Sequence, residues 1–215
     1  MVPLEQLSEA DITGRILEGE QSLYEIIVRR FNPYLYRVGR SYNYNHADTL
    51  DLMQDTFIGA YRALAQFAGR SDFKTWIIRI MMNNCYRKRE KASFKYEMAQ
   101  DLNDNATPMF TTSDRDTGTV VQNRELGHII EEALARIPFD YRMVFSLREV
   151  NGLNVSETAA LLGISEGNVK IRLNRSKAML RSQLEKAYSP RELFEFNLVH
   201  CDAVVGYVMN NINER

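Results

Sequence analysis

The sequence predicts an all-α protein in which two small helical domains are joined by a flexible acidic linker and followed by a helical C-terminal extension. Apolar residues recur at intervals of three and four positions through most of the chain, as they do on one face of a helix. No stretch shows the alternating pattern and hairpin turns that are typical of β-strands. The polar residues 97–122 lack helical periodicity and are rich in Asp, Asn, Thr and Ser. We therefore expect domains at 1–96 and 123–188, with the linker between them and the extension at 189–215.

Composition and cysteine content narrow the class of protein. The chain has 215 residues, is 45% hydrophobic and carries a net charge of −1. It has no apolar run near the ~18 residues of a membrane helix, and its N-terminus lacks the pattern of a signal peptide. We therefore expect a cytoplasmic protein with no membrane insertion. Two cysteines, Cys85 and Cys201, make neither a disulfide framework nor a paired-cysteine metal site, so we expect no metal and no other cofactor.

The small net charge hides two basic segments. Residues 70–95 carry 8 basic and 2 acidic side chains, a net charge of +6, and residues 165–186 carry 6 and 2, a net charge of +4. Local patches, and not the total charge, set the attraction of a protein for nucleic-acid phosphates. The sequence therefore predicts two nucleic-acid-binding segments in an otherwise acidic chain.

Three successive runs in the first domain have the apolar spacing of helices. They are Leu23, Ile26, Ile27, Phe31, Leu35 and Val38, then Leu52, Phe57, Ala60, Tyr61 and Leu64, then Ile77, Ile80 and Met81. The second run also carries Asp48, Asp51 and Asp55 on one side of the expected helix. That acidic side is either a docking face for a basic partner or a solvated surface above a core stripe.

The basic segment at 71–96 mixes cations with aromatic side chains. Its aromatic residues are Phe73, Trp76, Tyr86, Phe94 and Tyr96, and most of its cations follow Cys85. Single-stranded or melted nucleic acid offers unstacked bases to aromatic rings and phosphates to cations. The alternative is that the aromatic residues belong to the core and that the cations are a solvated helix end.

The second domain is expected to begin with a helix from about residue 123, and Pro138 starts another that ends at Asn151-Gly152. A helix-turn-helix then follows at 155–180. A small residue at Ala159, a glycine that can take a positive φ at Gly163 and an apolar residue at Val169 have the spacing of that motif.

Ser165 stands where the N-cap of the second helix of this motif belongs. Candidate base readers on that helix are Asn168, Lys170, Ile171 and Asn174, with Arg172 and Arg175 able to bind phosphates or guanines. The alternative is an ordinary two-helix corner with a solvated basic face. A helix-turn-helix alone would also fit a conventional transcriptional regulator that binds duplex DNA without core polymerase.

Taken together, these segments resemble the extracytoplasmic-function (group 4) branch of the bacterial sigma-70 family. The first domain carries DLMQDTF, the segment FAGRSDFKTW and the following RIMMNN, and the second carries IPFDYRMVFSLREVNGLNVSETAALLGISEGNVKIRLNRSKAMLR. The match covers about 20–95 and 125–187. It implies a sigma factor, which is not an enzyme but binds core RNA polymerase, recognises the minus-35 and minus-10 promoter elements and aids strand opening.

The resemblance implies a role for each segment. Core-polymerase-binding residues would be Asp48, Asp51, Gln54, Asp55, Phe57 and Tyr61. Residues that bind the minus-10 element would be Ser71, Phe73, Lys74, Trp76, Arg79, Asn83, Asn84, Arg87, Lys88 and Arg89, with the loop at 68–73 holding a flipped base. Residues that bind the minus-35 element would be Ser165, Glu166, Asn168, Lys170, Ile171, Arg172, Asn174 and Arg175.

The implied partners are promoter DNA and core RNA polymerase, through its β′ clamp helices and β flap. An anti-sigma factor is a further candidate partner. Two segments keep two interpretations each. The linker at 97–122 is either a mimic of RNA phosphates, through its aspartates, or a plain acidic tether. The extension at 189–215 is either a structural amphipathic helix or a regulatory lid over one of the domains.

Overall fold

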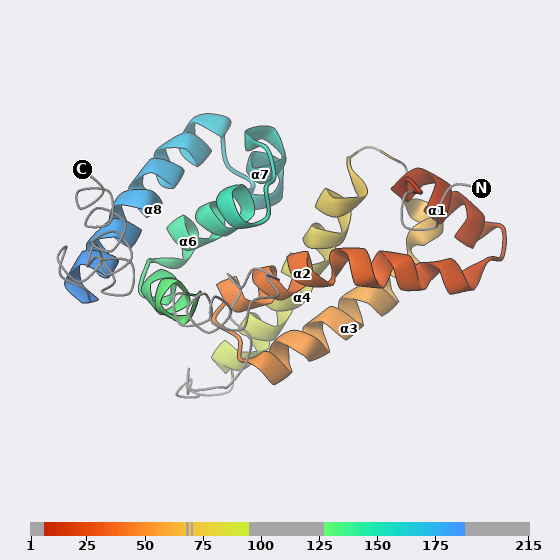
Figure 1. The fold of residues 1–215 in the computed structure, drawn as a ribbon, viewed down its shortest axis with the longest axis horizontal. Coiled ribbons are helices and arrows are strands. Elements are labelled where there is room, and N and C mark those ends of the chain that lie inside the picture. The colour runs from red at the N-terminus through yellow and green to blue at the C-terminus, as the bar shows by residue number, and fades with distance from the viewer. Residues whose placement is uncertain (1–6, 68, 70, 95–126, 188–215) are drawn as a thin grey trace, which may run out of the picture.

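The computed structural model describes residues 7–67, 69, 71–94 and 127–187, and the regular elements in these residues are all helical (Figure 1). This confirms the all-α fold that the sequence predicts. The first group of helices is α1 (Glu9–Leu17), α2 (Tyr24–Ser41), α3 (His46–Arg62) and α4 (Phe73–Phe94). The second group is a helix at 127–135, α6 (Phe139–Phe145), α7 (Val155–Leu162) and α8 (Glu166–Ala187). The linker and the C-terminal extension expected from the sequence lie outside the described residues.

Helices α2, α3 and α4 pack side by side around the apolar core of the first group, and α1 covers one end (Figure 1). The fully buried side chains include Ile27 on α2, Ala60 on α3 and Ile77 on α4. Removal of such side chains from water is the main favourable contribution to folding. Gly39 sets the crossing of α2 and α3, because a Cβ at this position would lie only 2.6 Å from Cγ2 of Thr49.

Side-chain caps fix where two of these helices begin. The hydroxyl of Ser8 accepts a hydrogen bond from the amide of Asp11 at the start of α1. The side chain of Asn45 accepts one from the amide of Asp48, at 2.8 Å, at the start of α3. Such caps satisfy backbone amides that have no partner within the helix.

In the second group, α6 begins directly after Pro138, as the sequence predicts. The α-helical hydrogen-bond pattern ends at Phe145, where a π-helical turn continues the helix. Residues Ser146–Val150 form a π-helical turn, closed by a 2.8 Å hydrogen bond from the amide of Asn151 to the carbonyl of Ser146. Gly152 follows with a φ of +67° and turns the chain toward α7. A π turn holds an extra residue compared with an α-helical turn.

The helix-turn-helix has the local structure that its sequence predicts. Asn154 and Glu157 form a reciprocal capping box at the start of α7. Gly163 ends that helix with a φ of +65°, in the left-handed region. Val169 is fully buried against Val144 and the turn of the motif, where it holds α8 on α6 and α7.

The two groups of helices pack against each other. Leu147 and Leu153, from the π turn and the chain after it, are buried in the same apolar cluster as α2 and α4. The π turn contacts α2, and α7 contacts α4. The described residues therefore share a core across the two groups.

Candidate nucleic-acid and partner interfaces

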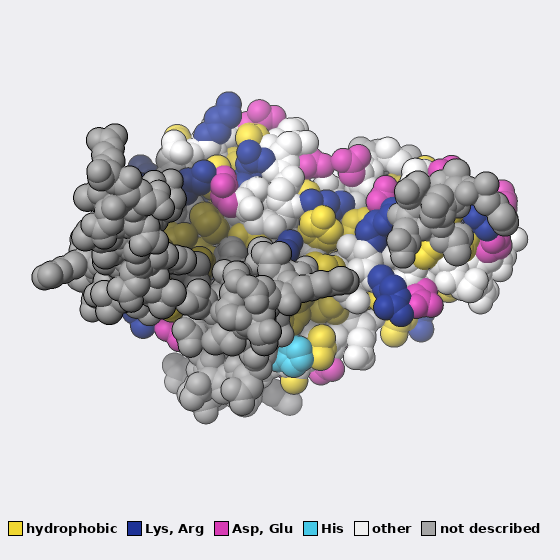
Figure 2. Space-filling view, in the orientation of Figure 1, with side chains coloured by type: hydrophobic (Ala, Val, Ile, Leu, Met, Phe, Trp, Pro, Cys, Tyr) yellow, Lys and Arg dark blue, Asp and Glu magenta, His cyan; other side chains and the backbone are white. Residues whose placement is uncertain are grey.

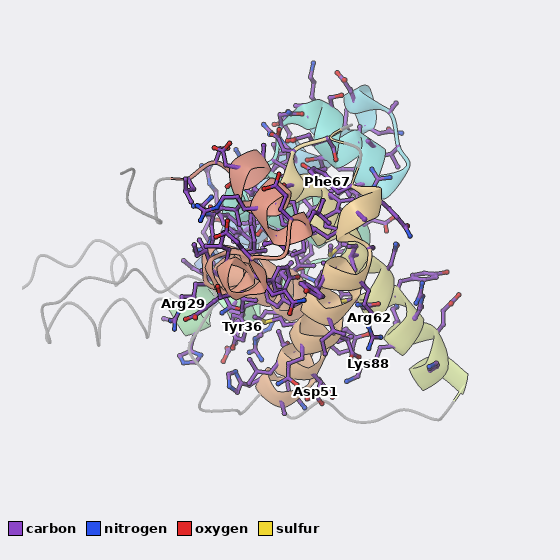
Figure 3. The ribbon with its side chains drawn as sticks, turned by 90° about the vertical axis from the view of Figure 1, so that its right-hand side faces the viewer. Arg29, Tyr36, Asp51, Arg62, Phe67 and Lys88 are labelled. Atoms are coloured by element: carbon purple, nitrogen blue, oxygen red, sulfur yellow. The ribbon has the colours of Figure 1, made fainter. Side chains whose placement is uncertain are left out.

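The acidic side of α3 is exposed at its centre. Asp51, Gln54 and Asp55 face solvent there. Asp48 is half-buried and forms an ion pair with Lys88 on α4. Figure 3 shows Asp51 and Lys88 on these two neighbouring helices. The acidic and basic segments expected to bind different partners thus meet along the α3–α4 boundary.

A shallow groove between these helices contains charges of both signs. It is lined by Asp51, Leu52, Asp55, Asn84, Arg87, Lys88 and Lys91. Asn84 donates a hydrogen bond to the hydroxyl of Thr56 at 3.0 Å, so its amide is engaged within the protein. The exposed Arg87 and Lys91 lie opposite the exposed aspartates of α3.

An open apolar groove lies on the neighbouring side of α3, against α2. It is lined by Gln21, Tyr24, Val28, Gln54, Phe57, Ile58, Tyr61 and Arg62. Phe57 is buried and forms the floor, whereas Ile58 is 51% exposed. The hydroxyl of Tyr24 donates to the carbonyl of Phe57 at 2.6 Å, and its ring meets that of Tyr61 edge-on with centroids 5.0 Å apart.

Sequence reasoning missed five residues of this apolar groove, namely Gln21, Tyr24, Val28, Ile58 and Arg62. Ile58 follows Gln54 by one helical turn, so its place beside the acidic side could have been read from the spacing. Tyr24 lies on another helix, and only the packing of α2 on α3 brings it to the groove. An apolar groove beside exposed carboxylates is suited to a partner helix with apolar and basic side chains.

An aromatic cluster stands at the start of α4. The ring of Phe73 lies 5.2 Å from Phe31, 5.3 Å from Phe67 and 5.2 Å from Trp76, between centroids. Phe73 is only 4% exposed, so it supports the cluster and does not face solvent. Trp76 is half-buried and keeps part of its ring at the surface.

A pocket opens beside this cluster, between α1, α2 and the start of α4. Its lining is Ser8, Glu9, Ala10, Arg30, Phe31, Tyr34, Phe67, Gly69, Ser71, Asp72, Phe73 and Lys74. The ammonium group of Lys74 stands over the Tyr34 ring, 4.3 Å from its centroid. Burial lowers the pKa of Lys74. The sequence indicated the loop and Lys74 but not Tyr34 or α1, which reach the pocket through tertiary packing.

The other residues expected to bind the minus-10 element divide between two surroundings. Ser71, Arg79, Asn83, Arg87 and Arg89 are exposed, which leaves them accessible to a nucleic acid. By contrast, the side chains of Asn84 and Lys88 already bind other residues of the protein. Apart from Ser71, which precedes α4, these residues lie on that one helix but do not share a common face.

The second basic segment is the first half of α8. The hydroxyl of Ser165 accepts a hydrogen bond from the amide of Asn168 at 3.2 Å and caps the helix. Side chains exposed on α8 include Glu166, Asn168, Lys170, Ile171, Asn174 and Arg175. Figure 2 shows basic side chains over the part of the surface where α7 and α8 lie.

Two arginines of α8 are positioned by α6. The guanidinium of Arg172 lies 3.4 Å from the carboxylate of Asp140. Arg175 donates a long hydrogen bond, at 3.4 Å, to the hydroxyl of Tyr141. Asn168, Lys170 and Asn174 are also exposed on α8, and side chains of these types suit base edges in a major groove.

The described residues contain neither a membrane-crossing helix nor a cluster of metal ligands. None of their helices combines the length and apolarity needed to cross a membrane. Their His, Cys, Asp and Glu side chains form no group of three that could hold a metal ion.

Comparison with protein families gives two matches, in the order of the two groups of helices. Residues 27–94 match sigma-70 region 2, and residues 127–180 match sigma-70, region 4. The relatives include the ECF RNA polymerase sigma-E factor of Escherichia coli (strain K12), which is 27% identical over 186 residues, or 84% of this chain and 96% of the relative. They also include the ECF RNA polymerase sigma factor SigM of Mycobacterium tuberculosis, 27% identical over 80% of this chain and 83% of its own length.

Two solved structures share the fold. CnrH, in complex with the cytosolic domain of CnrY, has a TM-score of 0.57 and 24% identity, covering 82% of this chain and 97% of that chain. RpoE of Bartonella quintana, in complex with the anti-sigma factor NepR, has a TM-score of 0.56 and 22% identity, covering 71% and 91%. The family matches and the relatives establish that the chain belongs to the extracytoplasmic-function branch of the sigma-70 family.

Proposed function

We propose that this sigma factor, itself not an enzyme and acting in the cytoplasm, brings core RNA polymerase to promoters by binding the minus-10 element with α4 and the minus-35 element with α8. One observation carries the proposal above all. A single chain holds both an aromatic pocket with basic surroundings and an exposed recognition helix. The first suits unstacked bases and the second suits duplex DNA, and initiation requires both.

The exposed side of α3 and the apolar groove beside it are the proposed contact with the β′ clamp helices of the polymerase. Asp51 and Asp55 would attract basic side chains and orient the partner, because charge complementarity acts on association rate and register. Ile58 and Tyr61 would supply the apolar contact. The second group of helices would contact the β flap.

The pocket beside Phe73 is the proposed site for one base of the non-template strand. Extrusion of a base costs a few kcal/mol of stacking and pairing, and a pocket must return that energy through contacts. Tyr34 and Phe67 offer ring faces, and Asp72 and Lys74 offer polar groups. Exposed cations farther along α4, such as Arg79, would bind the phosphates next to it.

The decisive experiment is transcription with core polymerase and a library of promoters. We expect initiation from a subset of promoters that share minus-35 and minus-10 sequences, and no initiation by core polymerase alone. A protein that binds duplex DNA tightly but never directs initiation would contradict the proposal and favour a conventional helix-turn-helix regulator.

A second experiment tests the base readers of α8. Substitution of Lys170 or Asn174 should change the preferred minus-35 sequence, with a cost of about 1–3 kcal/mol at the base concerned. The matched control is Lys186→Ala, at the far end of the same helix, where we expect the preferred sequence to stay the same. An unchanged preference in all three variants would remove Lys170 and Asn174 from the set of readers.

A further inference from the structure

Ile171, on α8, differs from its neighbours on the exposed side of that helix. It is 51% exposed, and among the described residues of α8 it is the only large apolar side chain exposed to this extent. A single apolar residue at a surface is common and carries no meaning by itself. The place of Ile171 on the helix therefore decides what its exposure implies.

Helix α8 buries one side against α6 and α7 (Figure 1). Val169 and Ser176, on that side, are fully buried. Because an α-helix turns by about 100° per residue, the opposite side carries Gly167, Ile171 and Asn174. These three residues are all exposed and form an uncharged strip. Ile171 thus lies in the middle of the side of α8 that faces away from the protein.

Positive charge lies on both sides of this uncharged strip. Lys170 flanks it on one side and Arg175 on the other, and both are exposed. A duplex has a phosphate backbone on each side of its major groove, and cations placed in this way attract it. The surroundings of Ile171 therefore favour DNA as its partner over an apolar protein surface.

Thymine is the base that offers an apolar group to such a side chain. The other bases present hydrogen-bond donors and acceptors in the major groove, whereas thymine adds its 5-methyl group. Ile171 stands in the second turn of α8, and the N-terminal part of a recognition helix is the part that contacts base edges. Its β-branched side chain has one strongly preferred χ1 rotamer in a helix, so the side chain is held in place before DNA binds.

We propose that Ile171 reads the 5-methyl group of a thymine in the minus-35 element. This inference rests on the proposed function and names the chemistry by which α8 selects one base. Cytosine at the same position would lack the methyl group and would set the apolar side chain beside a polar amino group. Ile171 is thus a specificity-determining residue that acts beside the polar readers Lys170 and Asn174.

The geometry of the helix also limits where this thymine lies. Ile171 and Asn174 are three residues apart, which puts their Cβ atoms about 5–6 Å from each other. Successive base pairs of a duplex are about 3.4 Å apart. The thymine should therefore lie within about two base pairs of the base that Asn174 reads.

The first experiment removes the methyl group from the DNA. A minus-35 duplex is selected from a random library by the full-length protein bound to core polymerase. Each thymine is then replaced in turn by uracil, which forms the same base pair but lacks the 5-methyl group. We expect one position at which uracil weakens binding about four- to tenfold, because burial of one methyl group accounts for about fourfold and its packing for the rest.

Two results of this uracil series would overturn the proposal. One is a selected element that has no thymine, or in which every replacement weakens binding by less than about twofold. The other is a sensitive thymine that lies more than about two base pairs from the base whose preference changes when Asn174 is substituted.

Three variants test whether Ile171 makes the contact. Ile171→Ser should bind the thymine and uracil duplexes equally, whereas Ile171→Val keeps a branched apolar side chain and should keep most of the difference. Leu17→Ser is the matched control, because it removes another aliphatic side chain, 56% exposed on α1, and should keep the full uracil effect. Circular dichroism checks that all three variants fold. An equal uracil effect in Ile171→Ser and in the unaltered protein would contradict the assignment.

A polymerase surface is the other partner that an exposed isoleucine could contact. The affinity for core polymerase is therefore measured without DNA, and we expect Ile171→Ser to match the unaltered protein. Weaker polymerase binding by Ile171→Ser, together with an unchanged uracil effect, would overturn the proposal and assign Ile171 to the polymerase.

The same uracil series with the full-length protein alone separates this proposal from the proposed function. Where no polymerase complex forms, the duplex is selected by the protein alone. A chain that never directs initiation would contradict the proposed function, yet a uracil effect that Ile171→Ser abolishes would still establish the thymine contact. Conversely, a chain that directs initiation without any uracil effect would overturn the thymine contact alone.

Discussion

The aromatic side chains of α4 differ in exposure, so some support the packing of their neighbours whereas others are accessible to a partner. Phe73 is buried among Phe31 and Phe67, so its expected part in minus-10 binding becomes the placement of its neighbours. Trp76 packs on Phe73 and keeps an exposed part of its ring. Tyr86 stands on the same helix and is 55% exposed. These three positions allow support and contact to be separated by substitution.

Trp76→Ala should impair strand opening more than it impairs formation of the closed promoter complex, because the ring would be needed only when bases are unstacked. We also expect a loss of about 2 kcal/mol in the free energy of unfolding, as part of the ring packs on the aromatic cluster. Permanganate footprinting measures opening, and gel shift measures promoter binding. Tyr86→Ala is the matched control. Equal defects in both steps would contradict the role given to Trp76.

Cys85 provides a prediction that depends on pH. Burial raises the pKa of this thiol from 9.0 to about 12. Because the folded state holds the proton more tightly than the unfolded state, this contribution to stability is complete below about pH 9 and is lost as the pH rises toward 12. In a Cys201→Ser background, we expect no alkylation near neutral pH until urea is added, as measured by mass spectrometry. Rapid alkylation of the native protein would contradict the burial of Cys85.

Residues far apart in sequence set the limit of what the sequence predicts at a site. Helical spacing alone was enough to place the candidate residues along α3 and α4, and their roles at the site stay predictions. Tyr24 and Tyr34 were not among the candidates, because both come from α2 and reach these grooves only through packing. The sequence alone also did not show whether Phe57 is buried or exposed, because an aromatic residue can lie on either side of an amphipathic helix. The structure shows that it is buried.

At the level of elements, the helix-turn-helix is the part that local sequence specifies most fully. Its cap at Ser165, its left-handed Gly163 and its buried Val169 are all confirmed. By contrast, α1 has too few buried apolar residues for a helical periodicity to be recognised in its sequence. The π turn at Ser146–Val150 was not expected either, because it arises where Leu147 and the chain after it pack into the other group.

Two glycines of this motif should respond in opposite ways to alanine. Gly163→Ala forces a side chain into the left-handed region and should lower the free energy of unfolding by about 1–2 kcal/mol. Gly167→Ala, in the first turn of α8 with only the Ser165 hydroxyl near its Cβ position, should raise it by about 0.5–1 kcal/mol. Urea denaturation measures both. A destabilising Gly167→Ala would contradict the open space around that position.

At the level of the whole molecule, the shared core predicts that the two groups of helices unfold together. Trp76, the only tryptophan, reports on the first group, whereas circular dichroism reports on both. We expect the two signals to change at one temperature. Gly163→Ala, in the second group, should lower the midpoint seen by Trp76 fluorescence by about 2–4 °C or more. Two separate transitions, or a fluorescence midpoint that does not move, would show that the groups are independent.

The contact between the groups was also beyond sequence reasoning. Its side chains come from segments far apart in the sequence, and local patterns do not show that they meet. Arg142 illustrates this. Burial beside Arg89 lowers its pKa to about 10, a surrounding that periodicity would not assign to an arginine. Only the fold shows that this residue joins α2 to the second group through Ser41.

The π turn at Ser146–Val150 has a consequence for length variation in this chain. Because it holds one residue more than an α-helical turn would, removal of a single residue would give one continuous α-helix. The chain beyond it would then leave that helix about 100° farther around the axis. Helices α7 and α8 would turn with it. Deletion of one residue there would thus change the direction in which the exposed side of α8 faces, without altering any residue on that helix.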